Sequence, residues 1–235
     1  MFDEDLDFNE LDFFTGADFT DSADLFEFDN RYLELPRNSE IEEKYLKYEY
    51  AEKLAKDLVL KKDCRFFVLI AGSFYFGDFL EAIILKYGFN VKRLLISTLS
   101  LNQNNVDSLA GLLNDGCVQK LDLIVSTFFF GHERHKHGLV PYLYEHLDKD
   151  NKFQLAAART HCKIAQMETT NGIFLNFHGS ANLRTSGNLE QFCIEENEQL
   201  YKFNERWQDE ILEKYKTIEK GFVSDKYIFK GEKTK

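Results

Sequence analysis

Short apolar runs alternate with amphipathic stretches over residues 65–147, and this alternation limits the fold more than any other feature of the sequence. It predicts strands at 65–71, 91–97 and 121–126. It predicts a helix after each strand, at 77–87, 105–114 and 139–147. Gly88 and Gly116 are expected to end the first two helices, and Pro141 lies in the first turn of the third, where a missing N–H costs little. A series of this kind predicts an α/β fold with a largely parallel sheet and helices on both faces.

The rhythm changes after residue 150, where expected strands follow one another with short connections. These strands are expected at 153–158, 161–167, 173–178 and 189–194. A final helix is expected over 197–220, because apolar or aromatic residues recur there at every third or fourth position. A further helix is expected over 39–60, where Ser39 and Glu42 form a capping-box pattern. The folded domain is therefore expected to cover residues 35–235 and to contain a mixed sheet.

Residues 1–34 are expected to form a separate acidic tail. Residues 1–30 contain 11 Asp or Glu and no Lys or Arg. The whole chain has 40 acidic and 29 basic residues, so the remainder carries 29 of each and is neutral overall. Such dense like charge opposes independent folding, although phenylalanines recur along the segment. Three interpretations stay open: a solubilising tail, a docking peptide for a protein partner, and a nucleic-acid mimic that covers a basic cleft of the same chain.

The cysteines and the start of the chain indicate where the protein works. Four cysteines are widely spaced and include no closely spaced pair, which favours free thiols in a reducing compartment. No apolar run reaches the roughly 18 residues that a membrane span needs. The chain starts with an acidic segment, whereas a secretion signal starts with a basic one. We therefore expect a cytoplasmic protein without a membrane partner.

Chemistry-bearing residues gather between positions 161 and 190. His161 and Lys163 are two residues apart, so a strand would place both side chains on one face. Glu168 follows, then the run Gly179-Ser180-Ala181-Asn182, and then Asn188 and Glu190.

This series resembles the HxK(x)4D…GSxN signature of the phospholipase D superfamily. The chain matches it as His161-x-Lys163-x4-Glu168 followed by Gly179-Ser180-x-Asn182, and the resemblance covers residues 65–220. Glu168 replaces the family's Asp. The segment between Glu168 and Gly179 is longer than the family pattern has, which fits a hairpin turn at 169–172. The resemblance implies a fold like one half of a phospholipase D enzyme.

The resemblance also implies a chemistry that these residue types can perform. His161 would attack phosphorus and form a covalent phosphohistidine. Lys163, Asn182 and Ser180 would stabilise negative charge on the phosphoryl oxygens, and Glu190 would orient the imidazole of His161. A second histidine must protonate the leaving oxygen. Because the chain has one copy of the motif, we expect a homodimer in which His161 of each subunit faces the other.

The expected function is therefore that of a metal-independent phosphodiesterase, a nuclease that cleaves DNA or RNA. No metal or other cofactor is expected, since the scheme requires none. The alternative is a catalytically inactive phospholipase D-like module that binds nucleic acid or protein.

Three further residues are candidates for substrate binding. Arg184, beside the GSxN run, could contact a phosphate or could be an ordinary loop charge. Ser73 lies in a Gly-Ser turn that could bind an anion through backbone N–H groups. His135 belongs to the segment 131–138, which is rich in ionisable side chains and bounded by glycines. We interpret this segment as a mobile loop that contacts phosphate or nucleic acid. A solvated charged loop is the main alternative, and a metal site formed by its three histidines is a further one.

The acidic tail generates a testable prediction. If it covers a basic cleft, deletion of residues 1–30 should tighten polynucleotide binding at low salt, because a competing polyanion is removed. Fluorescence anisotropy of a labelled oligonucleotide, measured with the full chain and the deletion variant, would test this. Equal affinities would reject the mimic and leave the docking and solubility interpretations.

Overall fold

The computed structural model describes residues 42–48, 50–62, 64–71, 74–184 and 188–218. The acidic tail and Ser73 lie outside these ranges, so their expected roles stay predictions. Within the described residues, no helix is both long enough and apolar enough to cross a membrane.

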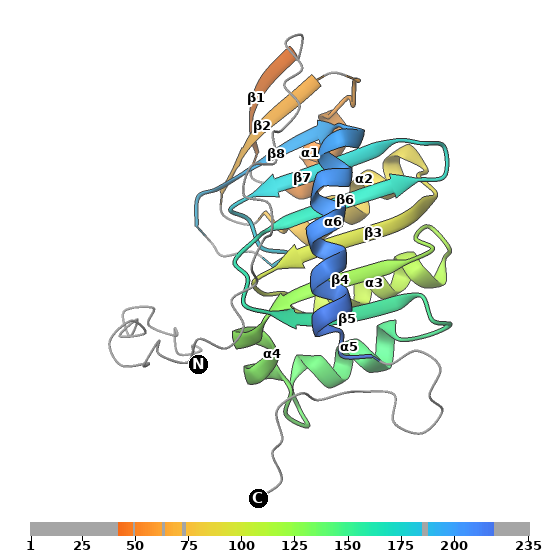
Figure 1. The fold of residues 1–235 in the computed structure, drawn as a ribbon. Helices are drawn as coiled ribbons and strands as arrows, with labels where there is room; N and C mark the ends of the chain where they lie inside the picture. The colour runs from red at the N-terminus through yellow and green to blue at the C-terminus, as the bar shows by residue number, and fades with distance from the viewer. Residues whose placement is uncertain (1–41, 49, 63, 72–73, 185–187, 219–235) are drawn as a thin grey trace, which may run out of the picture. The chain divides into compact units, whose positions relative to one another are not determined.

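Eight strands form one mixed sheet in the order β1-β2-β8-β7-β6-β3-β4-β5 (Figure 1). Their bounds are β1 Glu42–Tyr48, β2 Cys64–Ile70, β3 Val91–Thr98, β4 Leu121–Ser126, β5 Phe153–Ala158, β6 Ile164–Thr169, β7 Phe174–Gly179 and β8 Glu190–Glu196. The pair β1–β2 is parallel, and so is the trio β3–β4–β5. Between these two blocks, β8, β7 and β6 run antiparallel to each of their neighbours. The predicted mixed α/β sheet is confirmed.

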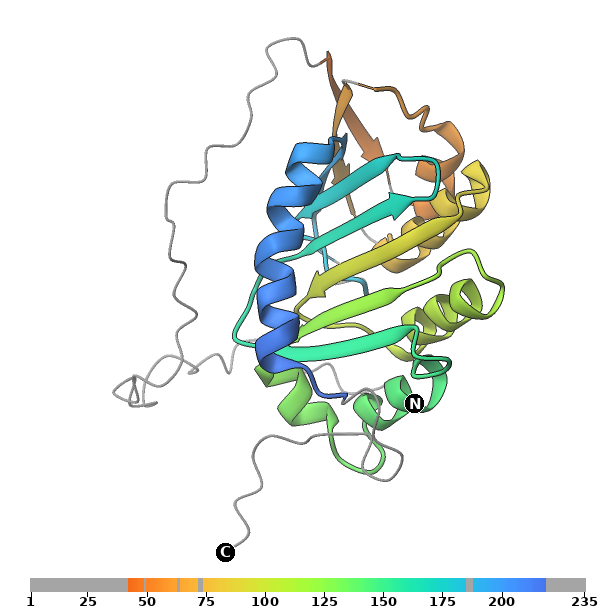
Figure 2. The same cartoon turned by 45° about the vertical axis from the view of Figure 1, so that its right-hand side comes forward.

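Helices cover both faces of this sheet, as predicted (Figures 1 and 2). One face carries α1 Ala51–Asp57, α2 Phe76–Tyr87, α3 Gln103–Asn114 and α5 Leu139–Leu147. The other face is crossed by α6 Glu198–Tyr215, which contacts β4, β5 and β7. A short helix, α4 Thr127–Glu133, follows directly from β4. Gly88 ends α2 in a left-handed conformation, as the sequence indicates.

A cluster of phenylalanines joins α2 to the centre of the sheet. Phe76 and Phe79 lie on one face of the helix because they are three residues apart. Their rings lie 5.0 and 5.5 Å from the ring of Phe192 on β8, and 6.3 and 6.0 Å from that of Phe177 on β7. Each buried aromatic ring removes about 150–250 Å² from water, so this cluster fixes the strands that lead to the GSxN run.

Arg93 of β3 joins α6 to the opposite face. Its guanidinium donates to Asp122 on β4 at 2.7 Å, and to Glu205 and Asp209 on α6 at 3.2 and 2.5 Å. Although burial opposes the charged form, the hydrogen bonds to Asp209 and Asp122 raise the pKa of Arg93 above its ordinary value. The helix is therefore held to the sheet by a group that stays charged.

The prediction of a helix over 39–60 is wrong. Residues 42–48 form β1, which pairs in parallel with β2, and only 51–57 are helical. The aromatic residues Tyr45 and Tyr48 favour strand, and pairing along β2 overrides the capping-box pattern.

Two expectations about the site region also need correction. His161 and Lys163 do not lie on a strand, because β6 begins at Ile164. Local hydrogen bonds shape the preceding connection: the N–H of Thr160 donates to Ala158 O, and the N–H of Cys162 donates to Thr160 Oγ1. The start of the segment 131–138 is the end of α4 rather than a loop, because Ser126 caps that helix by accepting from the N–H of Phe129.

Close packing of β7 against β8 generates a prediction. A Cβ at Gly179 would lie 2.2 Å from Gln191 O and 2.5 Å from Phe192 Cα, so Gly179→Ala should lower the free energy of unfolding by at least about 2 kcal/mol. Gly111→Ala on α3 is the matched control. Its Cβ would meet nothing within 4 Å, and it should raise the free energy of unfolding by about 0.5–1 kcal/mol. Urea denaturation measures both, and two equal effects would contradict the packing.

Candidate active site

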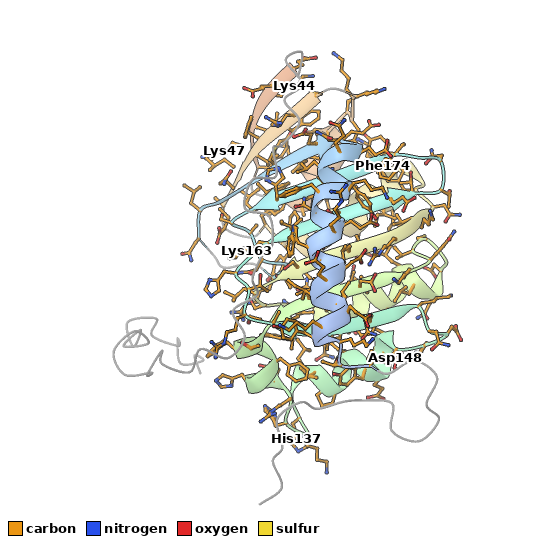
Figure 3. All side chains as sticks on the ribbon, in the orientation of Figure 1. Lys44, Lys47, His137, Asp148, Lys163 and Phe174 are labelled. Atoms are coloured by element: carbon orange, nitrogen blue, oxygen red, sulfur yellow. The ribbon has the colours of Figure 1, made fainter. Side chains whose placement is uncertain are left out.

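The reversed direction of β6 brings the predicted site residues to one edge of the sheet. Ile164, at the start of β6, pairs with Ser97 near the end of β3 and with His178 near the end of β7. Gly179 in turn pairs with Phe192 near the start of β8. The segments that carry His161, Lys163, Ser180, Asn182 and Glu190 therefore all leave the sheet at the same edge. Figure 3 labels Lys163 at this edge, where β6 begins.

The backbone of the His161–Lys163 segment is held from two sides. Lys163 O accepts from the N–H of Gly179 at 3.2 Å, which links the HxK and GSxN segments directly. Cys162 O accepts from the hydroxyl of Ser97 at 3.3 Å. The His161 side chain is exposed, and the ammonium of half-buried Lys163 donates to His161 O at 3.1 Å. Both side chains can therefore meet a ligand from solvent.

Ser180 connects the ends of β7 and β8. Its hydroxyl donates to the carboxylate of Glu190 and accepts from the N–H of Gln191 at 3.0 Å, while its own N–H donates to Gln191 O at 2.8 Å. The carboxylate of Glu190 is thus engaged by Ser180. Its expected contact with the imidazole of His161 stays a prediction.

Asn182 is anchored to the end of β3. Its Oδ1 accepts from the N–H of Leu99 at 3.1 Å and from the hydroxyl of Thr98 at 3.4 Å. Leu183 is buried, and its carbonyl accepts from the N–H of Gly77 on α2 at 2.9 Å. Because Oδ1 is held in this way, the Nδ2 group of Asn182 is the part of the amide that can donate to a bound anion. Thr98, which sequence reasoning missed, is a positioning residue with no motif of its own.

The other residues that the sequence singles out are Arg184, His135 and Glu168, and the structure places each of them differently. Arg184 is exposed and lies two residues after Asn182, the last residue of the GSxN run. His135 lies in the exposed turn after α4, on the β4–β5 side of the same edge. Glu168 does not join the site: it lies near the other end of β6, opposite Arg93, and pairs with Lys92 at 2.8 Å.

One group among the described residues has donor atoms suited to a metal ion, namely His178, Cys193 and Glu195 on β7 and β8. Burial lowers the pKa of His178 and raises the pKa of Cys193 to about 12, so both side chains are neutral at pH 7. The carboxylate of Glu195 already accepts from Arg65 at 2.7 Å and from Asn197 at 2.6 Å. The group fits a partly buried ion pair with two neutral neighbours, and we assign no metal to it.

The edge described above is suited to bind a tetrahedral anion. The ammonium of Lys163 and the Nδ2 amide group of Asn182 are donors, whereas the hydroxyl of Ser180 already donates to Glu190. The imidazole of His161 is a nucleophile or proton carrier. Donors held in place before a ligand arrives stabilise developing negative charge without reorganisation.

Comparisons with known proteins find similarity among solved structures alone: no family model and no curated protein matches the chain. TrmBL2, an archaeal chromatin protein, has a TM-score of 0.46 and 12% identity over 68% of this chain and 55% of its own length. NucT from Helicobacter pylori has a TM-score of 0.44 and 14% identity, over 58% of this chain and 88% of NucT. Nuc from Salmonella typhimurium, described as a phospholipase D family member, has a TM-score of 0.39 and 13% identity, over 57% and 86%.

These matches concern the fold. This chain spans just over half the length of TrmBL2. A phospholipase D family member is among the structures to which the chain is similar.

The anchoring of Asn182 generates a prediction that separates position from chemistry. Asn182→Asp keeps an acceptor for the N–H of Leu99 but replaces the Nδ2 donor by a negative charge. We expect thermal stability close to that of the unaltered protein and loss of binding of tungstate, a tetrahedral dianion, in calorimetry. Asn182→Ala leaves the N–H of Leu99 without this acceptor and should lower the free energy of unfolding by about 1–3 kcal/mol.

The control is Asn90→Asp, which makes the same change of charge at the other end of β3. Its tungstate affinity should equal that of the unaltered protein. An Asn182→Asp variant that binds tungstate normally would show that the amide faces no anion.

Proposed function

We propose that this chain is a metal-independent phosphodiesterase that cleaves DNA or RNA through a phosphohistidine at a dimeric active site. One observation carries the proposal: the hydrogen bond from the N–H of Gly179 to Lys163 O joins the HxK and GSxN segments at one edge of the sheet. This bond supports the assignment of a nucleophile, His161, a cation, Lys163, and a neutral amide donor, Asn182, to one site, as hydrolysis of a negatively charged phosphodiester requires.

In the first step, a ring nitrogen of His161 attacks phosphorus. A P–N bond forms, and the P–O bond to the leaving oxygen breaks. Lys163 and the Nδ2 group of Asn182 stabilise the charge that moves onto the non-bridging oxygens. The leaving oxygen takes a proton from a second imidazole, which we assign to His161 of the partner subunit.

In the second step, water replaces the enzyme on phosphorus. The partner's His161, now neutral, takes a proton from water as the water oxygen attacks. The P–N bond breaks, which releases a phosphate monoester and restores the first His161. This exchange of roles requires two histidines, and a chain with one HxK motif acquires the second through a two-fold axis.

A second candidate function has an observation of its own. The carboxylate of Glu190, which should orient the imidazole of His161, is hydrogen-bonded to Ser180, and Glu168 replaces the Asp of the motif. A phospholipase D-like module that has lost catalysis and keeps nucleic-acid or protein binding would tolerate both features.

The test is hydrolysis in the presence of EDTA. The full chain is incubated with labelled single-stranded DNA, duplex DNA and RNA. We expect His161→Ala to lower the rate by at least about 10³-fold, because the nucleophile is lost. The matched control is His146→Ala on α5. The imidazole of His146 stacks on the ring of Tyr142, with 3.8 Å between the ring centroids, and takes no part in the proposed site. This variant should leave the rate unchanged.

Two further readouts decide between the candidates. A substrate labelled on phosphorus should label the unaltered protein when the reaction is stopped in alkaline detergent, where the P–N bond of a phosphohistidine survives, and should leave His161→Ala unlabelled. The active species should sediment as a dimer. Equal rates for His161→Ala and the unaltered protein, or no hydrolysis of any of the three polymers, would overturn the enzyme and support the binding module.

A further inference from the structure

A cationic surface with an exposed aromatic ring lies beside the candidate active site and is not used by the chemistry proposed above. We name it the α4 surface. It consists of Phe128, His132, Arg134, His135, Lys136 and His137, all of which are exposed.

Helix α4 turns one ring of a phenylalanine triplet outward. Phe129 and Phe130 are each 7% exposed and belong to the core, whereas Phe128 is 58% exposed. The ring of Phe128 meets that of His132, four residues later, edge to face at 5.4 Å. An aromatic ring held in water by the packing of its neighbours offers a flat apolar face to a ligand.

The turn after α4 is closed by its own hydrogen bonds. The N–H of Gly138 donates to His135 O at 2.8 Å, and the N–H of His137 donates to His135 Nδ1 at 3.3 Å. A Cβ at Gly138 would lie 2.0 Å from Glu133 O, so this position requires glycine for close packing rather than for a hinge. The predicted mobile loop is a compact turn in this structure.

The acidic residue of the segment faces inward. The carboxylate of Glu133 accepts from the N–H of Leu139 at 2.9 Å, at the start of α5. Arg134, Lys136 and the neighbouring histidines therefore face solvent without an acidic side chain from their own turn. A fixed turn that presents cations binds a polyanion at a lower entropy cost than a flexible one.

The α4 surface continues into the candidate active site. Ser126, the last residue before α4, pairs with Ala158, the last residue of β5. The next residues of the chain are Arg159, which is exposed, and then the connection with His161 and Lys163. Two strands, β3 and β4, separate β5 from β6, which corresponds to about 14 Å along the sheet edge. Figure 3 labels Lys163 near one end of this stretch and His137 beyond the other.

We propose that the α4 surface is an ancillary binding site for single-stranded nucleic acid, in which Arg134 and Lys136 contact phosphates and Phe128 stacks on a base. The inference rests on the proposed function for the identity of the polymer. A single strand fits because its bases are free to stack on an aromatic ring, whereas a duplex hides their faces. A strand seated on the α4 surface would extend past Arg159 to His161.

The test is equilibrium binding with the full chain carrying His161→Ala, which prevents cleavage of the probe. The probes are a labelled 20-residue oligothymidylate, a duplex of equal length, and heparin as a polyanion without bases. In this background Arg134→Gln/Lys136→Gln should reduce the slope of log affinity against log salt for the single strand by about 1.4, which is about 0.7 for each lost contact. Phe128→Ala should weaken single-strand binding by about 5- to 150-fold and leave heparin binding unchanged.

The control pair is Lys149→Gln/Lys152→Gln, which removes equal charge before β5, at the opposite edge of the sheet. Its salt slope should match that of the His161→Ala background, and circular dichroism should show that every variant is folded. An unchanged salt slope in Arg134→Gln/Lys136→Gln would overturn the proposal. Equal loss of heparin and single-strand binding in Phe128→Ala would show that Phe128 does not stack on a base. Tighter binding of the duplex than of the single strand would show that the ligand is not single-stranded.

These outcomes are independent of the hydrolysis experiment. If the binding predictions for the α4 surface fail while the unaltered protein still cleaves in EDTA, the proposal of an ancillary site is wrong and the proposed phosphodiesterase activity is supported. If single-strand binding changes as expected while no hydrolysis is found, the proposed binding site on the α4 surface is supported and the catalytic proposal is wrong.

Discussion

The antiparallel pairing of β6 with β3 decides where His161, Lys163, Ser180 and Asn182 lie. Had β6 run parallel to β3, the segment with His161 and Lys163 would leave the sheet at the edge opposite Thr98. Reversal brings Ile164 beside Ser97 and lets β7 return to the same edge, so that the N–H of Gly179 reaches Lys163 O. The site is therefore a product of strand direction, and the phenylalanines that join α2 to β7 and β8 support that arrangement.

Elements with a strong local pattern could be predicted from the sequence. The helix at 139–147 and the strands at 121–126 and 153–158 have the predicted bounds, because buried apolar runs and an amphipathic period are local signals. The strand β1 could not be predicted, since its structure depends on pairing with β2 along an edge that the sequence does not reveal. Helix α4 is short and depends on the Ser126 cap and on the burial of Phe129 and Phe130.

The candidate site likewise contains residues that could be predicted from the sequence and residues that could not. The spacing of His161, Lys163, Ser180 and Asn182 matches a motif, so these residues could be found by pattern alone. The groups that hold them could not. Thr98 lies more than 80 residues from Asn182 in sequence, and a threonine at the end of an apolar strand carries no signal of a role in positioning. The contact between Ser180 and Glu190 was also unforeseen, because the motif describes residue types and says nothing of which side chains pair.

The low pI of this chain, about 5.1, does not oppose the proposed binding of a polyanion, because the charge is unevenly distributed. Outside residues 1–30 the chain has equal numbers of acidic and basic residues. In the fold, several of the acidic side chains are engaged by partners within the protein. Asp122, Glu205 and Asp209 are engaged by Arg93 on the α6 face. At the edge with His161, the carboxylate of Glu133 accepts from the N–H of Leu139, and that of Glu190 accepts from the hydroxyl of Ser180. Arg134 and Lys136 at this edge are exposed. Attraction of a charged ligand depends on this local field, which screening confines to about 10 Å at ordinary ionic strength, rather than on net charge.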